Sequence, residues 1–526
     1  MDTNAAAAAP TRIRKAVIAG GTLTAWIAAA RLASACQGTV RVTVLETPHR
    51  PEPQVTALAP TLQRDLFDRL GIPESTWMRA SAASFNVAVK YMNWGVGEHH
   101  FYIPQDGAPS DCEGFPLSDF WLLRRRAGRT VDPFDHACFR EPPLMDALKS
   151  PRWLDGRAAF PYGWHADTVM LTDFLRGKAI ETCGVRVVTG ELLGAHRDED
   201  GMLTALHTTR GDLTADFFLD CTGSESLLLA GILGEPFIGA ADRLLADSTL
   251  SLTLPHDSDL HGVEPYTTAT AVPHGWIWRR PLLGRHGAGI VYASTLTTPD
   301  EAARSLRSAL GLPGDRVEPT HAPLRVGHTG RTWVKNCVAL GGAAWSTDPL
   351  ADDQRATLDL LDRLIRDFPS PDDREAPAAR FNRAAADHYR RALDLAQLRY
   401  AASPRTDAPF WTAQRALPLT DDLHATVEAH AAGLSVTPDE APLRTLLTAL
   451  TPHTGTPSPA LTHHPHALRT AEDHFTRITR QQRILGETLP DAHTYLDRLH
   501  GRIPRTPHGE SNDGGMRTVP PAMTPW

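Results

Sequence analysis

The sequence predicts an α/β fold with a Rossmann-type dinucleotide-binding lobe, a β-rich platform and a C-terminal helical lobe. Three features predict it: a strand–turn–helix–strand unit opens the chain, a later apolar strand ends in Asp-x-x-Gly, and helical periodicity dominates from residue 377 to about 499. With 526 residues the chain is long enough for one large two-lobed protein or for two to three domains.

The opening unit spans residues 15–46. An apolar strand, 16–19, leads into a glycine-containing turn; an alanine-rich helix follows, and a second strand ends at an acidic residue. In this arrangement the turn approaches a ligand's pyrophosphate at the helix N-terminus, and the acidic residue binds the ribose. The predicted contacts are Gly20, Gly21, Thr22, Ala25 and Glu46.

Two later segments extend the predicted nucleotide site. The apolar strand 215–220 ends in Asp220-Cys-Thr-Gly223, and a strand at 334–340 runs into Gly341-Gly342 before a helix that begins near Asp352. A helix N-terminus that follows a glycine turn suits a ligand phosphate. Asp220, Gly223, Gly341 and Gly342 therefore join the predicted cofactor contacts.

The predicted nucleotide-binding lobe is discontinuous, because long segments separate its pieces. It covers residues 12–375, with its own pieces at 12–75, 165–235 and 330–375. The inserted segments 76–164 and 236–329 would form the β-rich substrate platform. We expect a helical lobe at 376–502 and a disordered tail at 503–526, which has few apolar residues.

Composition excludes several classes of function. The net charge is −8, from 61 acidic and 53 basic residues, without a basic block, so we expect no nucleic-acid partner. The N-terminus lacks the order of a secretory signal, and no run of about 18 apolar residues follows, so we expect no membrane partner. Six cysteines without a Cys-x-x-Cys pair suggest reduced thiols in a cytoplasmic protein.

Histidine-rich stretches do not predict a metal site. The pairs at 99–100 and 463–464 lack a nearby cysteine or a regularly spaced carboxylate that would complete a ligand set. We therefore predict no metal.

The segment His274-Gly-Trp276-Ile-Trp278-Arg-Arg-Pro281 carries the most specific motif, and several others follow in a consistent order along the chain. They are Leu70-Gly-Ile-Pro73, Asn93-Trp94, Trp164-His165, Gly262-Val-Glu-Pro-Tyr266 and Ala408-Pro-Phe-Trp411. With these motifs the chain resembles the flavin-dependent tryptophan halogenases. The resemblance implies a flavin-monooxygenase-type, glutathione-reductase-like FAD-binding lobe, reduced FAD supplied by a separate flavin reductase, a small aromatic substrate, and often a homodimer.

The residues that carry out halogenation in that family differ here. The family lysine aligns with Asn86, and a carboxamide cannot form a chloramine or present an ammonium charge. The family glutamate aligns with Ala351, and the following Asp352 and Asp353 would repel a halide. Candidate catalytic positions are therefore Asn86, the nearby ammonium of Lys90, and Asp352 and Asp353, one of which could be a general base.

The cofactor and substrate segments are also altered. Thr22 stands at the second glycine of the Gly-x-Gly-x-x-Gly turn, and Pro53–Leu58 lacks the glycines of the family's flavin strap, so the FAD site is degenerate and FAD binding stays open. Ile103-Pro-Gln105 replaces groups that hold the indole in the family. The predicted substrate-pocket residues are His100, Phe101, Gln105, Trp276 and Trp278.

We therefore predict a halogenase-like enzyme of natural-product biosynthesis that does not halogenate. It would act on an indole- or tryptophan-derived intermediate by an oxidative or a cofactor-free transformation. Two alternatives stay open: a non-catalytic pseudo-halogenase that forms a heterodimer with an active homologous halogenase, and a halogenase whose catalytic role has moved to Lys90.

Overall fold

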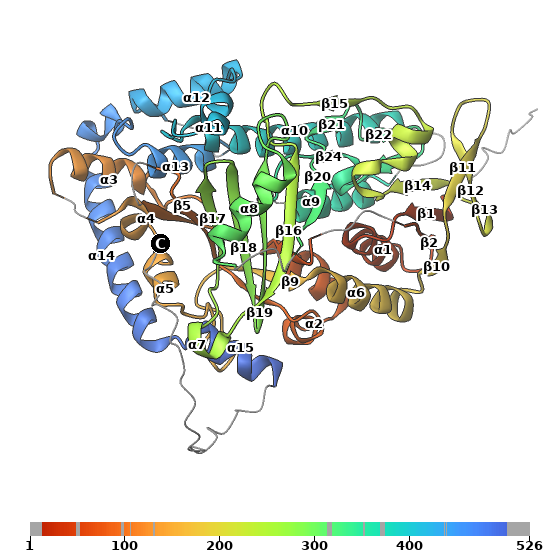
Figure 1. The fold of residues 1–526 in the computed structure, drawn as a ribbon, viewed down its shortest axis with the longest axis horizontal. Coiled ribbons are helices and arrows are strands. Elements are labelled where there is room, and N and C mark those ends of the chain that lie inside the picture. Colours follow the sequence, from red (N-terminus) through yellow and green to blue (C-terminus); the bar gives the residue numbers. More distant parts are fainter. Residues whose placement is uncertain are drawn as a thin grey trace, which may run out of the picture.

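A six-stranded sheet organises the N-terminal lobe in the computed structural model (Figure 1). The structure describes residues 13–48, 53–95, 99–105, 107–129, 132–312, 318–350, 353–368, 374–435, 437 and 439–501. The predicted disordered tail lies outside these ranges. Within them, no helix combines the length and apolar character needed to cross a bilayer.

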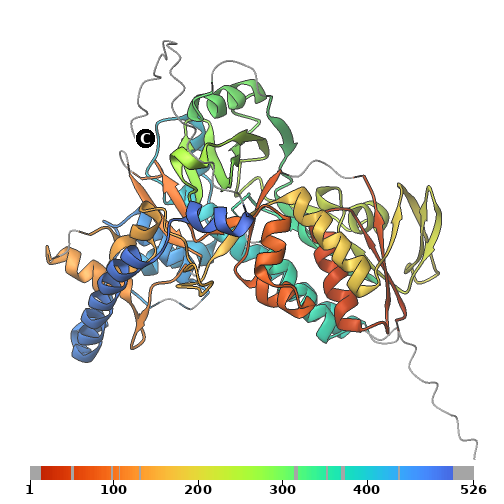
Figure 2. The same ribbon diagram turned by 90° about the horizontal axis from the view of Figure 1, so that it is seen from below.

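Five strands of this sheet are parallel, as expected for a Rossmann-type lobe. Helix α1 (Leu23–Cys36) packs between α6 (Thr168–Cys183) and α9 (Asp353–Arg366) beside the sheet (Figure 2). The predicted α/β fold class is confirmed. The strand order is β10 (Arg186–Thr189), β2 (Arg41–Glu46), β1 (Lys15–Ala19), β14 (Phe217–Asp220), β23 (Cys337–Ala339) and β22 (Trp333–Val334).

The single strand predicted at 334–340 is wrong. The segment is a tight hairpin, in which β22 pairs antiparallel with β23. Lys335 at the turn has a φ of 55°, and the Asn336 side chain bonds the backbone of Leu203 in both directions, at 2.8 and 3.0 Å. Lys335 and Asn336, two polar residues inside an apolar run, form a turn that hydrophobic periodicity alone does not predict.

A seven-stranded sheet forms the platform and unites strands from both inserted segments. Strand β5 pairs parallel with β17, so residues from the two insertions lie side by side. Helix α8 (Pro299–Ala309) covers the face formed by β16, β18 and β19 (Figure 1). The order is β20 (Thr320–Pro323), β16 (Ser248–Pro255), β19 (Arg285–Tyr292), β18 (Gly275–Leu282), β17 (Thr267–Val272), β5 (Ala88–Met92) and β6 (His100–Pro104).

A small three-stranded sheet connects the lobe to the platform through β3 (Val55–Leu58), β9 (Gly163–Asp167) and β4 (Ser84–Asn86). The remaining short strands are β7 (Asp111–Cys112), β8 (Phe115–Pro116), β11 (Leu192–Arg197), β12 (Leu203–Thr208), β13 (Gly211–Thr214), β15 (Phe237–Gly239), β21 (Gly327–Thr329) and β24 (Trp345–Ser346).

Helices fill most of the C-terminal region and pack on the end of the platform that carries β5 and β6. They are α10 (Glu375–Ala401), α11 (Pro409–Arg415), α12 (Asp421–Ala432), α13 (Ala441–Leu450), α14 (Pro465–Thr488) and α15 (Ala492–His500). The remaining α-helices of the described ranges are α2 (Glu74–Ala80), α3 (Leu117–Arg126), α4 (Phe134–Cys138), α5 (Pro142–Asp146) and α7 (Ser258–His261).

Candidate functional site

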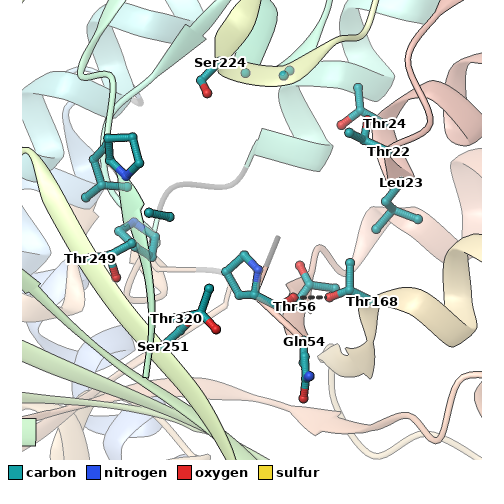
Figure 3. Close-up of a pocket in the computed structure, with 18 of the residues that line it drawn as sticks. Thr22, Leu23, Thr24, Gln54, Thr56, Thr168, Ser224, Thr249, Ser251 and Thr320 are labelled. Carbon is teal, nitrogen blue, oxygen red and sulfur yellow. Dashed lines mark hydrogen bonds between the residues drawn. The ribbon is translucent and has the colours of Figure 1, made fainter. Parts of the chain in front are cut away.

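A cavity of about 550 Å³ opens between the carboxyl ends of the parallel strands and the platform sheet. Several threonine and serine side chains lie along its walls (Figure 3). We call it the first cavity. Its hydroxyl-bearing residues are Thr22, Thr24, Thr56, Thr168, Thr222, Ser224, Thr249, Ser251, Thr253 and Thr320.

The glycine-containing turn before α1 forms one side of the first cavity. Gly20 has a φ of +126°, and a Cβ there would lie 2.2 Å from the carbonyl oxygen of Cys221, so only glycine fits. Thr22 caps α1: its hydroxyl accepts from the N–H of Ala25 at 3.4 Å and donates to Cys221 O at 3.2 Å. One of the N–H groups that such a turn offers to a phosphate is therefore capped by the protein itself.

The main-chain N–H groups of the next two residues have no intrahelical partner, because they belong to the first turn of α1. Both residues, Leu23 and Thr24, line the cavity, whereas Gly20 and Gly21 are not among the described residues that line it. Gly341 follows β23 with a φ of +59°, and a Cβ there would lie 3.0 Å from the Thr24 side chain. This close approach needs glycine, and it leaves room for a phosphate at the helix N-terminus.

The two carboxylates predicted to contact a cofactor differ in how many more hydrogen bonds they can accept. Asp220 is fully buried and accepts from Thr222 twice and from the N–H groups of Leu228 and Leu229 at 2.9 and 2.8 Å. Burial raises the pKa of Asp220, and these hydrogen bonds oppose the shift. Its lone pairs are taken by the protein.

Glu46 can accept a further hydrogen bond. Its Oε1 accepts from Arg176 Nε at 2.7 Å, and its Oε2 accepts from Arg176 Nη2 at 3.4 Å and from the Thr189 hydroxyl at 2.9 Å. A carboxylate offers about four lone-pair sites, so the side chain can still accept a bond from a ribose hydroxyl. Gly223, with a φ of +68°, and Gly342 also line the first cavity, and Ala25 is buried in α1. The residues fit FAD at the helix N-terminus and at the glycine turns, but not at Asp220.

The platform side of the first cavity is built on β18. A Cβ on Gly289 of the neighbouring strand would come within 2.6 Å of the Trp278 ring, so glycine makes room for that indole. Arg280, two residues along β18, is 5% exposed. It donates from Nη1 to Val55 O at 3.2 Å and from Nη2 to Pro349 O at 2.5 Å. Burial lowers the pKa of Arg280 to about 10, so it is cationic at neutral pH.

A second cavity, of about 610 Å³, lies between β5–β6 and the helices α9, α10, α12 and α13. Tyr91 of β5 and Ile103 of β6 face it, as does Gln105 directly after β6. Phe101 stacks on Tyr91 with ring centroids 4.9 Å apart, and it lines a further cavity of about 380 Å³ next to α3 and α4. His100 is not among the described residues that line these cavities, and Trp276 is fully buried with its Nε1 bonded to Tyr400.

The segment Asp348-Pro349-Leu350 separates the first and second cavities. Pro349 lines the first, whereas Asp348 and Leu350 line the second. Two buried arginines fix it from opposite sides: Arg280 donates to Pro349 O, and Arg399 pairs with Asp348 at 2.5 Å, both side chains being 3% exposed. We call this segment the wall.

The residues directly after the wall lie outside the described ranges. Ala351 and Asp352 are among them, and of Asp353 only the backbone at the start of α9 is described. Two candidate catalytic residues, Asp352 and Asp353, therefore have no described side-chain geometry.

Asn86 ends β4 and is 3% exposed. Its Oδ1 accepts from the N–H of Thr267 at 3.1 Å and from the Thr267 hydroxyl at 3.3 Å. That hydroxyl lies 2.8 Å from Nε2 of His165, whose pKa burial lowers to about 3. Asn86 thus belongs to a neutral, buried network that joins β4, β17 and β9, and it is not among the described residues lining the first two cavities.

Lys90 lies on the face of β5 opposite to Tyr91, away from the second cavity. Its Nζ is 3.9 Å from Asp146 and 5.0 Å from the centre of the Tyr102 ring. Burial lowers the pKa of Lys90, and Asp146 partly offsets the shift. His136 joins the same cluster, with ring nitrogens 3.0 Å from Asp135 and 3.0 Å from Asp146.

One group of side chains within the described ranges could reach a common metal ion: His196, His207 and Asp212. All three are exposed on the β11–β13 sheet, and His207 Nδ1 lies 2.7 Å from Asp212. This mutual hydrogen bonding accounts for their proximity, and none of them lines the first two cavities.

Sequence reasoning missed Arg280 and Arg399. Arg280 lies inside the Trp-x-Trp-x-x-Pro motif, where two adjacent arginines in an otherwise apolar strand were the available signal. Arg399 had no such signal, because it comes near the end of a long helix that carries several arginines.

Comparison with known proteins identifies the family. Residues 15–491 match the family model for tryptophan halogenase. The tryptophan 7-halogenase of Lentzea aerocolonigenes is 37% identical over 528 residues, covering 93% of this chain and 99% of the relative. The solved tryptophan 6-halogenase of Streptomyces toxytricini superposes with a TM-score of 0.85 at 32% identity, covering 93% of this chain and 99% of that one.

A second solved structure is a tryptophan C-6 flavin-dependent halogenase from taromycin biosynthesis. It superposes with a TM-score of 0.85 at 31% identity and covers 92% of this chain and 99% of that chain. Both neighbours agree with the layered α/β architecture and the helical C-terminal region described above. This chain belongs to the tryptophan halogenase family.

Proposed function

We propose that the protein binds FAD in the first cavity and oxidises a small indole- or tryptophan-derived molecule in natural-product biosynthesis, without lysine-dependent halogenation. One observation carries the proposal. At the position where the resemblance places the halogenating lysine, Asn86 is a buried hydrogen-bond acceptor in a neutral network. A carboxamide in that role has no free amine to take up oxidised halogen.

Lys90 does not replace the missing amine in this proposal. Its ammonium belongs to the cluster with Asp146 and Tyr102, on the face of β5 turned away from the second cavity. This argues against a relocated halogenase.

FAD suits the first cavity because Leu23 and Thr24 open a helix N-terminus there and Gly341 comes close to Thr24. Glu46 ends the neighbouring strand β2 and is not among the described residues that line this cavity, but it retains acceptor capacity for a ribose hydroxyl. Bound FAD, reduced by a separate flavin reductase, would supply the oxidising chemistry in the presence of oxygen. The protein's residues would hold the cofactor and exclude bulk water. The names of the relatives support an indole substrate, since they act on tryptophan.

The test incubates the purified protein with FAD, NADH, a flavin reductase, oxygen, and sodium chloride or bromide. L-Tryptophan and indole intermediates from the same gene neighbourhood serve as substrates, and mass spectrometry identifies the products. We expect flavin-dependent oxidised products without halogen, unchanged by Lys90→Ala. A chlorinated or brominated product that depends on enzyme and reduced FAD would overturn the proposal, and no turnover with any substrate would favour a non-catalytic partner.

Oligomeric state belongs to the same proposal. The family resemblance implies a dimer. Light scattering on the purified protein, alone and mixed with an active homologous halogenase, distinguishes a homodimer from the heterodimer of the pseudo-halogenase hypothesis.

A further inference from the structure

Three strands of a small sheet bring two histidines and a carboxylate together on one face. His196 lies on β11, His207 on β12 and Asp212 on β13, and the strands are neighbours in the order β11-β12-β13. His207 is the direct cross-strand partner of Asp212. His196 is opposite Ala205, which is two residues before His207. Residues that are opposite each other, or two apart on one strand, share a face, so the strand register places all three side chains on the same side.

The ligand atoms of these side chains converge. Each carboxylate oxygen of Asp212 faces a different imidazole: Oδ1 lies 2.7 Å from His207 Nδ1, and Oδ2 lies 3.4 Å from His196 Nε2. One ligand atom from each residue lies within 4.8 Å of the other two. Zinc bonds to nitrogen and oxygen of about 2.0–2.2 Å place tetrahedral ligand atoms roughly 3.4 Å apart. Small side-chain rotations would therefore bring all three ligand atoms onto one ion.

The sheet fixes the positions of the three residues and leaves their polar ends open to solvent. Side-chain exposure is 61% for His196, 53% for His207 and 47% for Asp212, so a hydrated ion can reach all of them. The opposite face of the sheet, with Leu206 and Leu213, packs against the hydrophobic core. A ligand set on paired strands is held more precisely than one on loops.

The charges near the cluster favour a cation. The turn between β11 and β12 carries three exposed carboxylates, Asp198, Glu199 and Asp200. Arg197 and Arg210 also lie close along the chain, but their guanidinium groups donate to the backbone carbonyl oxygens of Ile232 and Thr189. With Asp212, the carboxylates outnumber the guanidinium groups, and a negative surface raises the local concentration of a divalent ion.

Hydrogen bonding holds the three side chains near one another, and a bound ion would replace these bonds. A single histidine–carboxylate pair is not distinctive: His424 and Glu428 form one on α12, with the two groups 3.5 Å apart. The small sheet differs because a second imidazole faces the same carboxylate. Two imidazole nitrogens and one carboxylate oxygen are ligands that zinc prefers, whereas magnesium and calcium prefer a shell of oxygen atoms.

We propose that His196, His207 and Asp212 form a binding site for one zinc ion on the exposed face of the β11–β13 sheet. Three protein ligands leave a coordination position for water. The ion would tie together the strands that connect β10 to β14, at the end of the nucleotide-binding lobe away from the platform (Figures 1 and 2). None of the three residues lines the first or the second cavity, so the site is separate from the proposed function.

Isothermal titration calorimetry with zinc chloride tests the proposal on untagged protein that has been treated with EDTA and desalted. We expect one zinc ion per chain. His207→Gln and Asp212→Asn should each weaken binding at least about tenfold, because losing a ligand costs no less than losing a group that only orients one. Magnesium chloride should give no binding that these variants abolish. His424→Gln is the matched control, since it removes an exposed histidine with a single carboxylate neighbour, and it should leave zinc affinity unchanged.

Thermal unfolding in EDTA and in excess zinc separates metal binding from a purely structural role. An ion that binds only the folded protein raises the melting temperature, here by about 2 °C at a zinc concentration a hundred times the dissociation constant. His196→Gln keeps the hydrogen bond between His207 and Asp212. This variant should therefore melt with the parent protein in EDTA and lose the increase in zinc.

Two results would overturn the site. One is the absence of zinc binding by the parent protein. The other is zinc binding, or a zinc-dependent increase in melting temperature, that stays the same in the His196, His207 and Asp212 variants, because other histidines would then hold the metal. Neither result bears on FAD binding or on turnover of an indole substrate.

Discussion

Replacing Asn86 with lysine restores the amine of the halogenating relatives, and we expect this change to destabilise the protein without producing a halogenase. In the folded protein the Asn86 carboxamide accepts from the N–H and the hydroxyl of Thr267. An ammonium has no acceptor, so both donors lose their partner. The surrounding network offers no negative charge, because His165 is neutral there.

The cost has two parts. A buried backbone N–H left without a partner costs about 1–3 kcal/mol. A buried ammonium without a carboxylate adds several kcal/mol more, after allowance for relaxation of the structure. Asn86→Met isolates the first part, because methionine removes the acceptor without adding a charge. We therefore expect Asn86→Met to lose about 1–3 kcal/mol of unfolding free energy and Asn86→Lys about twice as much or more.

Urea unfolding followed by fluorescence of the 12 tryptophans measures both variants against the parent protein. Repeating it between pH 7 and 10 separates the charge from the lost hydrogen bonds. Burial lowers the pKa of the introduced lysine below its value in the unfolded chain. Between the two pKa values the unfolded state binds more protons than the folded state. The stability of Asn86→Lys therefore rises toward pH 10, and that of Asn86→Met does not.

The reasoning is refuted if Asn86→Lys unfolds at the same urea concentration as the parent while Asn86→Met is destabilised. That result would mean that the lysine side chain reaches water or a counter-charge, and that position 86 opens toward a cavity. Halogenated tryptophan from the Asn86→Lys variant would lead to the same conclusion.

Three further predictions concern a buried ion pair, a titrating histidine and a glycine that packs against an indole. Arg399→Met should cost about 3–5 kcal/mol because it leaves Asp348 buried and unpaired, and adding Asp348→Asn should recover part of the loss in a double-mutant cycle. Burial opposes protonation of His136, but its two aspartate partners prevail and raise its pKa to about 9. The stability that the protonated His136 contributes is complete below about pH 6.5 and is lost as the pH rises through 9. The melting temperature should therefore fall over that pH range, and His136→Gln should make it less dependent on pH. Gly289→Ala should cost about 1–3 kcal/mol by pressing on a buried indole, whereas Gly177→Ala in α6, where a Cβ meets nothing within 4 Å, should not destabilise.

The sequence was most informative about secondary structure in the nucleotide-binding lobe. Strand, glycine turn and helix follow one another locally between residues 15 and 46, so the pattern carries the structure directly. The hairpin at Lys335 was not predicted, because its turn depends on one residue with positive φ, and hydrophobic periodicity carries no information about φ.

The candidate site was less accessible to prediction, because long-range contacts form it. The acceptor role of Asn86 depends on Thr267, which is 181 residues away in the sequence. The wall depends on Arg280 and Arg399, which come from a strand and a helix that flank it on either side. Such long-range pairings decide which side chains line a cavity, and a single sequence does not reveal these pairings.

The parallel pairing of β5 with β17 has a consequence for how the chain folds. Strand β5 ends at residue 92, but its partner β17 begins at residue 267. The ribosome must therefore synthesise the residues between these two strands before β5 can pair with β17. Until then β5 and β6 present an unpaired edge that can associate with other chains. Substitutions in β17 should therefore appear first as poor soluble yield during expression, even where the mature protein would tolerate them.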